Sequence, residues 1–425
     1  MITPSFALTA TERVLPRLAL DFTTASLDSR VTFTRSGGTA TVTNASGNVV
    51  TIGANLPRFD FDPIALTCKG LLIEESRVNY VQQSADFATS WTLIGSTIQT
   101  NQITSPDGTL NADKIIEDTS NSIHLSLWNT AMPNCNQNLA FSCYFKANSR
   151  TKVRLSMVNG ATGSGYNEAN FNLSTVSVIS TANAGNATGV AASITSVGNG
   201  WYRCVITGQP STAADPVRAD IYLLDAAGSA SYLGDGVSNL YAWGAQLEIG
   251  AFGTSLIPTA GSQVTRTADI ATMTGTNFSS WYNASEGAFL ASAVLTRQAA
   301  IALTGIFSAN DNTGLTNYMN AFYRGTGALG TNIYAGSVSQ LDQNTLGVTV
   351  ANTVVNIGIA YKLNNSVSYA NATVQTTDTS VTIPTVTQLQ LGFTPTGAYL
   401  NGILRNFRFW PQRILNAEGQ AFSKG

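Results

Sequence analysis

The sequence predicts an all-β protein, in which two antiparallel β-sandwich or jelly-roll domains follow an irregular N-terminal segment and one short helix lies at the C-terminus. Runs such as VRLSMV from Val153, RCVITG from Arg203 and ADIYLL from Ala219 alternate their side chains or carry β-branched and aromatic residues. Clusters of Gly, Asn, Asp, Ser and Pro separate these runs, and helical periodicity is almost absent. Many short strands with turn-rich connections are typical of sandwiches and jelly rolls.

Composition divides the chain into three parts. Residues 1–81 form an N-terminal entry segment, in which arginine and aspartate recur beside aromatic residues. Residues 82–265 form the first β domain, and the stretch SLIPTAGSQVTRTAD, with Pro258 and Gly261, marks the crossing to a second β domain at 266–425. Near the end of this second domain, Asn416 is expected to cap a short helix that holds Glu418 and Phe422.

The chain is poor in charge. Its 425 residues include 22 lysines and arginines against 24 aspartates and glutamates, so that 11% are charged, where about a quarter is usual in soluble domains. Neutral polar residues must therefore cover most of the surface. A net charge of −2 argues against nucleic acid or an anionic membrane as a partner, because there is no basic excess. No apolar run approaches the roughly 18 residues that span a bilayer, and Met1 to Leu20 lacks the basic start of a secretory signal.

The sequence offers little for a metal or a cofactor, and we expect neither. The four cysteines form no CxxC pair, and His124 is the one histidine, so a zinc site is not indicated. Buried, reduced cysteines in a chain folded in the cytoplasm are favoured over a disulfide between Cys135 and Cys143. In SANDNTG, Asp311 lies between two asparagines, which favours a polar turn over a calcium site with a single carboxylate.

Three groups of motifs, in this order, resemble virion proteins of tailed bacteriophages. LDFTTASLDSRVTFTRSGG, NLPRFDFDP and GLLIEESRVNYVQQSADFATSW are similar to a recurrent N-terminal module of tail fibres, tail spikes and head spikes. VGNGWYRCVITG and YLGDGVSNLYAWGAQLEIGAFGTSLIPTAGSQVTRTAD resemble a jelly roll of the carbohydrate-binding-module type. LGFTPTGAYLNGILRNFRFWPQRILNAEGQAF is similar to a concanavalin A-type or laminin-G-like sandwich.

The resemblance implies a structural or adhesive protein of the virion surface that is made in the host cytoplasm and is not an enzyme. It implies a homotrimer, attachment to capsid or tail proteins through the N-terminal segment, and contact with host-surface polysaccharide. Two alternatives stay open at this point. One is a purely architectural virion protein without a ligand, and the other is a polysaccharide depolymerase with Glu74, Glu75 or Glu248 as its acid.

Trp201 and Tyr202 follow a turn signal, Gly198-Asn199-Gly200, at the start of a strand. We expect the two rings to lie on opposite sides of the sheet, one in the core and one outside. A ring on the outside could stack against the apolar face of a sugar, so both residues are candidate ligand contacts.

Gln246 and Glu248 are the second pair of candidate ligand contacts. In YAWGAQLE, strict alternation places Tyr241, Trp243, Ala245 and Leu247 on one face and Gln246 and Glu248 on the other. Amide and carboxylate groups on an open sheet face could bind a glycan, and an ordinary hydrogen-bonded strand face is the alternative. By the same rule, ILRNFRFW places Arg405 and Arg408 on opposite faces of a central strand or of a strand at a subunit contact.

The N-terminal segment holds an unusual share of the charges of the chain. We expect these residues to form arginine–carboxylate bridges that order a segment with little regular structure. A glycosidase pair among the carboxylates is the competing hypothesis, but such a pair works only at a specific separation with one pKa raised, and the sequence determines neither. The expected network comprises Asp21, Arg30, Arg35, Arg58, Asp60, Glu74 and Arg77.

Overall fold

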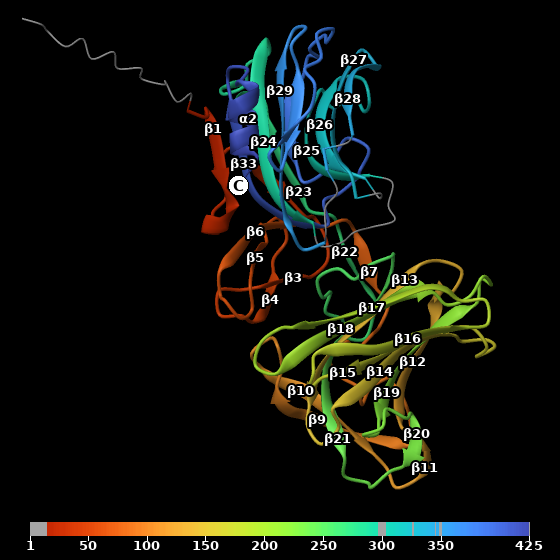
Figure 1. Cartoon of the computed structure of the whole chain (residues 1–425). Coiled ribbons are helices and arrows are strands. Elements are labelled where there is room, and N and C mark those ends of the chain that lie inside the picture. Colours follow the sequence, from red (N-terminus) through yellow and green to blue (C-terminus); the bar gives the residue numbers. More distant parts are fainter. Residues whose placement is uncertain (1–14, 296–302, 325–326, 345, 348–350, 425) are drawn as a thin grey trace, which may run out of the picture.

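The computed structural model describes residues 15–295, 303–324, 327–344, 346–347 and 351–424, and these build two β-sandwiches that lie end to end (Figure 1). All strand pairs are antiparallel, and the helices of the described residues are short. The predicted all-β class with sandwich domains is therefore confirmed. We call the first sandwich, built from residues 92–249, the central sandwich, and the second the composite sandwich.

The central sandwich consists of two six-stranded sheets, and all of its strands fall within the predicted range 82–265. Its core lies between the sheets and contains Phe141, Phe145, Phe171 and Cys204. The first sheet has the order β17-β18-β13-β21-β10-β9, with β9 at Ser96–Thr104, β10 at Leu110–Glu117, β13 at Leu139–Ala147, β17 at Thr188–Ser196, β18 at Trp201–Gln209 and β21 at Asn239–Ile249. The second has the order β16-β15-β14-β19-β12-β8, with β8 at Thr92–Ile94, β12 at Leu125–Asn134, β14 at Lys152–Asn159, β15 at Tyr166–Asn172, β16 at Ser177–Ala184 and β19 at Pro216–Leu224. A small ribbon pairs β11 at Asn121–Ile123 with β20 at Ser231–Leu233.

The composite sandwich combines strands from both ends of the chain. Its first sheet has the order β31-β30-β29-β24-β33-β6-β5, with β1 paired to β33. These strands are β1 at Leu18–Asp21, β5 at Phe59–Phe61, β6 at Cys68–Ile73, β24 at Glu286–Leu295, β29 at Val354–Lys362, β30 at Val367–Ala370, β31 at Thr373–Val374 and β33 at Gly402–Trp410. The second sheet has the order β2-β23-β32-β25-β26-β27-β28. Its strands are β2 at Thr32–Thr34, β23 at Ile270–Thr274, β25 at Thr304–Asn310, β26 at Tyr318–Tyr323, β27 at Leu329–Ala335, β28 at Val338–Gln343 and β32 at Gln388–Leu391.

The N-terminal segment, which the sequence predicts to be irregular, contributes strands to both sheets of the composite sandwich. Leu18 of β1 lies opposite Phe409 of β33, β2 pairs with β23, and Leu71 of β6 lies opposite Leu404. Because these pairings extend both sheets of the composite sandwich, the N-terminal strands and residues 264–424 form one unit. The central sandwich is inserted between its two parts.

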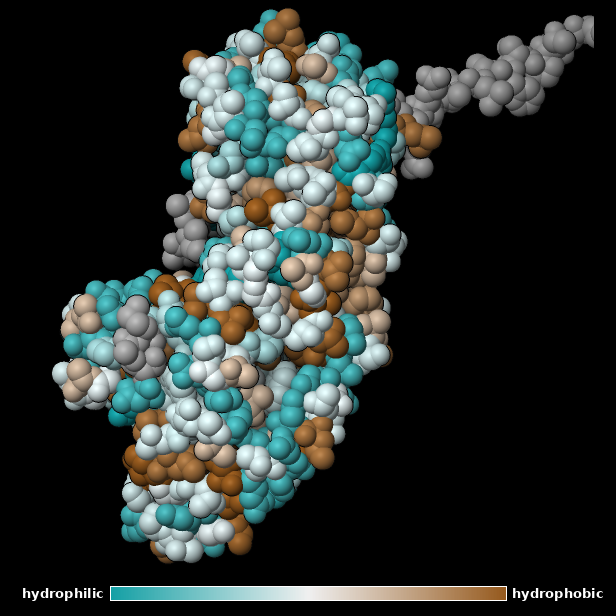
Figure 2. Space-filling view, turned by 180° about the vertical axis from the view of Figure 1, so that it is seen from behind, coloured by the Kyte–Doolittle hydropathy of each residue, from teal (hydrophilic) through white to brown (hydrophobic). Residues whose placement is uncertain are grey.

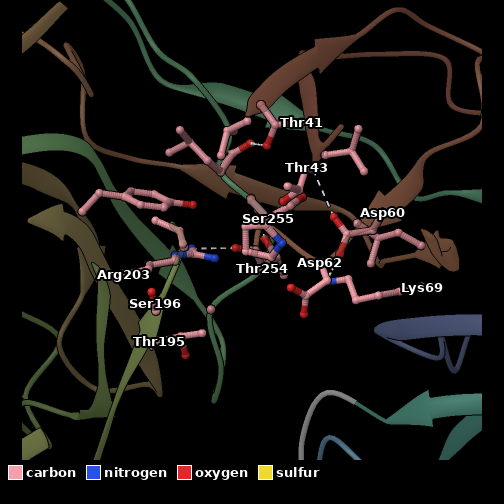
Figure 3. A pocket seen from close by; sticks show the side chains of 18 of the residues that line it. Thr41, Thr43, Asp60, Asp62, Lys69, Thr195, Ser196, Arg203, Thr254 and Ser255 are labelled. Atoms are coloured by element: carbon pink, nitrogen blue, oxygen red, sulfur yellow. Dashed lines mark hydrogen bonds and ion pairs between the residues drawn. The ribbon is translucent and has the colours of Figure 1, made fainter. Parts of the chain in front are cut away.

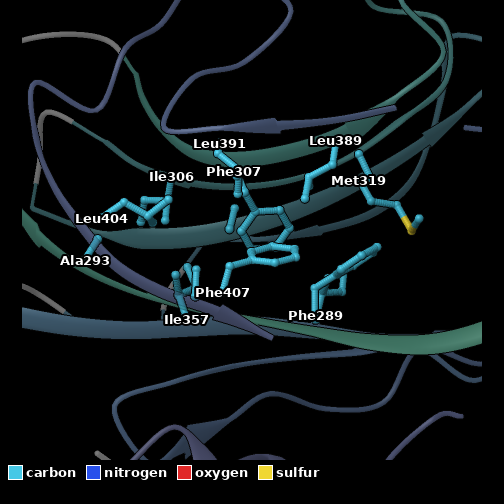
Figure 4. Packing of buried hydrophobic residues seen from close by; sticks show 14 of the residues in the cluster. Phe289, Ala293, Ile306, Phe307, Met319, Ile357, Leu389, Leu391, Leu404 and Phe407 are labelled. Carbon is cyan, nitrogen blue, oxygen red and sulfur yellow. The ribbon is translucent and has the colours of Figure 1, made fainter. Parts of the chain in front are cut away.

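Aromatic rings fill the space between the two sheets of the composite sandwich. Phe289, Phe307 and Phe407 meet there, and the ring centroids of Phe307 and Phe407 are 5.3 Å apart (Figure 4). Leu18 and Leu20 of β1 and Phe33 of β2 belong to the same buried cluster. The N-terminal strands therefore contribute to the core as well as to the sheets.

The helices are few and short, and none of those in the described residues is long and apolar enough to cross a membrane. They are the 3-10 helix η1 at Phe22–Thr24, α1 at Thr276–Ser279 and α2 at Asn416–Phe422. The C-terminal helix is present as expected, but its N-cap is Leu415 rather than Asn416. The backbone N–H of Leu415 donates to the Glu418 carboxylate at 2.7 Å, so the cap falls one residue earlier than the sequence predicts.

Two small ribbons and a linker join the sandwiches. The junction hairpin pairs β3 at Ala40–Thr43 with β4 at Val49–Ile52, and a second ribbon pairs β7 at Arg77–Asn79 with β22 at Val264–Arg266. The linker, residues 250–263, follows β21. Figure 2 shows the molecule from the side opposite to Figure 1, and on this face hydrophilic and hydrophobic residues are mixed over both sandwiches.

Candidate functional site

A cleft of about 380 Å³, lined by both polar and apolar side chains, lies at the junction of the two sandwiches. The junction hairpin and the β5–β6 region form one wall, the edge strand β17 and its neighbour β18 form the other, and the linker lies between them. Figure 3 shows hydroxyl and charged side chains from all three elements around this space. They are Thr41, Thr43, Asp60, Asp62, Lys69, Thr195, Ser196, Arg203, Thr254 and Ser255.

The carboxylates on the N-terminal wall are engaged in local contacts. Asp60 forms an ion pair with Lys69 and accepts a hydrogen bond from the backbone N–H of Thr43 at 3.0 Å. Asp62 accepts from the backbone N–H groups of Ala65 at 2.7 Å and Ile64 at 2.9 Å, and these bonds lower the pKa of its carboxyl. Asp62 is therefore ionised at neutral pH, as an acceptor for hydroxyl groups would be.

Arg203 dominates the opposite wall. Its guanidinium donates to the Ser142 hydroxyl at 2.9 Å and to the Thr254 carbonyl at 2.7 Å, and it lies over the Tyr144 ring at 5.5 Å. Thr195, on the edge strand β17, is exposed beside it. The linker is thus tied to the central sandwich directly at the floor of the cleft.

A cluster of buried charges lies beneath the cleft. Arg58 is fully buried and pairs with Asp269, which is also fully buried, and with Glu74 at 2.8 Å. Arg35 pairs with Asp269 at 3.1 Å, and Arg266 lies 3.4 Å from Glu74. Each of these charges is compensated inside the protein, as burial requires.

Glu74 connects this cluster to the linker. Its carboxylate accepts from the backbone N–H of Ser255 at 2.8 Å and from the Ser255 hydroxyl at 2.6 Å. Burial alone would raise the pKa of Glu74, but the charges of Arg266 and Arg58, together with the Ser255 hydrogen bonds, hold it well below its usual range. Glu74 is therefore a fixed anion rather than a proton donor.

The expected charge network is found in part. Arg35, Arg58 and Glu74 do meet, but they meet around Asp269 and Arg266, which are not among the expected residues. The TRTAD motif carries both missing residues, and no spacing rule connects it to a segment about 200 positions earlier.

The other four expected members of the network lie outside it. Asp21 caps η1 by accepting from the Thr23 backbone at 3.0 Å, and Asp60 pairs with Lys69. Arg30 pairs with Asp28 at 2.7 Å, and Arg77 pairs with Glu75 at 2.5 Å. These are short-range contacts, three of them between residues two positions apart.

Trp201 and Tyr202 lie on opposite sides of their sheet, as the sequence predicts. Tyr202 packs against the core between the sheets. Trp201 lies on the outer side, where it is 1% exposed and donates from Nε1 to the Thr104 carbonyl at 3.1 Å. Val49 of the junction hairpin and Leu256 of the linker belong to the same apolar cluster. Trp201 therefore stabilises the junction, and its ring is not free to stack on a sugar.

Gln246 and Glu248 are fully buried as well, so the expectation that they contact a glycan is corrected. The Gln246 amide accepts from the Ile257 backbone N–H at 2.6 Å and donates to Glu248 at 2.8 Å. Glu248 accepts from the backbone N–H and the hydroxyl of Thr254, each at 2.8 Å. Both side chains hold the linker against the sheet.

Strict alternation fails along β21 because of a β-bulge at Gly244. Opposite β13, the register shifts between the pairs Ser142–Gln246 and Tyr144–Trp243. Gly244 has a φ of 66°, and an added Cβ would lie 2.8 Å from the Tyr144 ring. Trp243 consequently lies on the outer face, whereas Ala245 and Leu247 belong to the core.

The described residues contain no group of three or more His, Cys, Asp or Glu side chains that could hold a metal ion. Asp311 accepts from the backbone and hydroxyl of Thr313 and from the Asn317 amide, which gives a polar turn. His124 is buried, with Nδ1 2.6 Å from the Gly95 carbonyl oxygen. All four cysteines are free thiols.

Comparison with known proteins gives a likeness of fold. No family model and no curated protein matches the chain. Among solved structures, the CBM40 of a Ruminococcus gnavus IT-sialidase bound to α2,3 sialyllactose is 12% identical, with a TM-score of 0.30 over 35% of this chain and 87% of that one. The NanB sialidase of Streptococcus pneumoniae is 13% identical, with a TM-score of 0.30 over 35% of this chain and 26% of that one. A SAP-like pentraxin from Limulus polyphemus is 12% identical, with a TM-score of 0.27 over 32% and 69% of the two chains.

Proposed function

We propose that this chain is a structural and adhesive component of a tailed-bacteriophage virion, a fibre, spike or capsid decoration, which contacts host-surface glycans without cleaving them. The junction cleft, where hydroxyl and charged side chains gather among apolar ones, is the observation that carries the proposal. Hydroxyl groups of Thr43, Thr195 and Ser196 line it, beside the ion pair of Asp60 with Lys69. A polysaccharide binds through many weak hydrogen bonds of its hydroxyl groups. The neutral hydroxyls and single charges of this cleft can form such bonds.

The state of the carboxylates supports binding rather than cleavage. A glycosidase acid needs a pKa raised towards neutrality. In the cleft, the pKa of Asp62 and that of Glu74 are both lowered, and Asp60 is held by Lys69. Each carboxylate therefore serves as an acceptor or as a structural anion in this proposal.

Attachment to the virion is assigned to the composite sandwich, because the N-terminal strands form part of it. Leu56 and Leu66 lie exposed on the loops around β5 and β6 and offer apolar surface to a capsid or tail protein. A homotrimer would present three clefts, so that individually weak glycan contacts add through multivalency. Nucleic acid and membranes are not partners in this proposal, and the site of action is the virion surface.

Filling the cleft tests the proposal. Thr195→Trp places a large ring in the cleft from the edge strand, and Ala191→Trp places the same ring on the same side of β17, away from the lining. We expect the full-length protein and the Ala191→Trp variant to bind host cells and a glycan array, and the Thr195→Trp variant to lose that binding.

Absence of binding by all three proteins would leave a purely architectural virion protein. Release of reducing ends from host capsule by the unmodified protein would instead reveal a depolymerase and contradict the proposal. Equal binding by both tryptophan variants would place the glycan elsewhere on the surface.

A further inference from the structure

A second cavity, of about 290 Å³, opens on the outer face of the composite sandwich. Strands β24, β29 and β33 form its floor, and Phe422 of α2 forms one side. Its polar lining consists of Ser292, Asn356, Arg405, Asn406 and Arg408. This volume is at the low end for small-molecule sites and suits one compact group rather than a long chain segment.

A β-bulge brings the two arginines together. Ser292 lies opposite Asn406 and Ala293 lies opposite Leu404, so Arg405 is the extra residue in β33. Strict alternation would have separated Arg405 and Arg408 onto opposite faces. The bulge corrects that expectation and places both on the face away from the core, where they line one cavity.

Arg405 and Arg408 differ from most other arginines in that their side chains have no polar partner among the described residues. In the described part of the chain, the side chains of Arg17, Arg405 and Arg408 are the only arginine side chains with neither an ion pair nor a hydrogen bond. All three belong to neighbouring chain segments, since Arg17 precedes β1 and its backbone N–H donates to the Phe409 carbonyl of β33 at 2.8 Å. Among the described residues, no acidic side chain pairs with the positive charges at this face.

The nearest acidic residue on the paired strand is already engaged. Asp21 lies opposite Asn406, but its carboxylate accepts from the backbone and hydroxyl of Thr23. Arg405 is half-buried, whereas Arg408 is exposed, so one guanidinium is partly shielded from water and the other is reachable. A planar guanidinium binds a carboxylate through two parallel hydrogen bonds, and partial burial strengthens that contact.

We propose that this cavity binds the carboxylate of an acidic sugar residue, such as a uronic acid, in an anionic host polysaccharide. The guanidinium groups of Arg405 and Arg408 would donate hydrogen bonds to the carboxylate. The amides of Asn356 and Asn406 would form hydrogen bonds with the sugar hydroxyls. The inference rests on the proposed function in one respect, that the ligand is a glycan. It adds that this glycan is anionic and that it binds at a site separate from the junction cleft.

Titration calorimetry on the full-length protein tests this assignment. The probes are a short oligogalacturonide, its methyl ester, a neutral maltooligosaccharide and inorganic phosphate. We expect binding of the oligogalacturonide that weakens with added salt, and affinity about tenfold or more lower for the methyl ester. Arg405→Ala and Arg408→Ala should each remove that preference. Arg324→Ala is the matched control, because its guanidinium is also partly exposed and lies 3.9 Å from Asp342.

The outcomes separate this inference from the proposed function. Equal affinity for the acid and its methyl ester, or an acid preference that survives both arginine substitutions, would overturn the carboxylate site and leave the junction cleft untouched. Phosphate binding as tight as that of the oligogalacturonide would overturn the sugar assignment. A changed oligomeric mass of the variants, with unchanged affinity, would show that the arginines meet a second copy instead. If Arg405→Ala and Arg408→Ala remove the acid preference both with the junction cleft open and with it filled by Thr195→Trp, the carboxylate site is supported independently of the junction cleft.

Discussion

Arg58 and Asp269 lie 211 positions apart in the chain and form a fully buried ion pair. The same guanidinium donates from Nη1 to the Thr41 carbonyl at 3.1 Å and to the Ser255 hydroxyl at 2.7 Å. It thereby connects the junction hairpin, the linker and the segment that leads into the composite sandwich.

Removing Arg58 should destabilise the protein strongly. Arg58→Met leaves Asp269 buried with less compensation, and breaking such a buried pair costs about 3–5 kcal/mol of unfolding free energy. Chemical denaturation measures this loss. Arg30→Met, which breaks a partly exposed pair with Asp28, is the control and should cost about 1 kcal/mol. Similar losses for both variants would show that the junction does not depend on the buried pair.

Acid should weaken the junction through Glu74. Its pKa is lowered in the folded protein from an ordinary value of 4.5, so its contribution to stability is complete above pH 4.5 and is lost as the pH falls towards the folded pKa. The difference in unfolding free energy between the unmodified protein and Glu74→Gln should therefore be constant above pH 4.5 and shrink below it. Denaturation curves at several pH values measure this difference. A gap that is independent of pH down to strongly acidic conditions would contradict the assignment.

The sequence predicted the strands well and the faces of two strands poorly. Period-two alternation predicts which side a residue faces only while the register is unbroken. A bulge at Gly244 and another at Arg405 each shift the pattern by one residue. Glycine can adopt the positive φ that Gly244 needs, so that position carried a usable signal, whereas nothing distinguishes Arg405 in a strand.

Which candidate residues are accessible depends on contacts between distant segments, and local sequence pattern does not predict these contacts. Trp201, Gln246 and Glu248 were correctly placed on strands, but the linker and the junction hairpin cover them. Likewise, Arg58 finds Asp269 only because the N-terminal strands join the composite sandwich. Pairing between distant segments, rather than local pattern, decides which polar residues are buried.

Gly244→Ala should separate steric contact from backbone strain. Both Gly244 and Gly163 have a positive φ, 66° and 68°, but an added Cβ meets the Tyr144 ring only at Gly244. We expect Gly163→Ala to cost about 1–2 kcal/mol from the backbone alone. Gly244→Ala should cost about 1–3 kcal/mol more, because the ring must move in a packed cluster. Thermal and chemical unfolding of both variants measures the difference, and equal losses would mean that the bulge tolerates a side chain.

Thiol labelling should distinguish Cys68 from the other three cysteines. Cys135, Cys143 and Cys204 are fully buried, whereas Cys68 is partly exposed on β6. Burial raises the pKa of all four thiols, that of Cys135 to about 11, so exposure to the reagent is what distinguishes Cys68. Ellman's reagent should therefore label Cys68 first in the native protein and the rest only on unfolding. Cys68→Ser should abolish the first phase, and a fast phase that persists in this variant would show that the central sandwich opens in the native state.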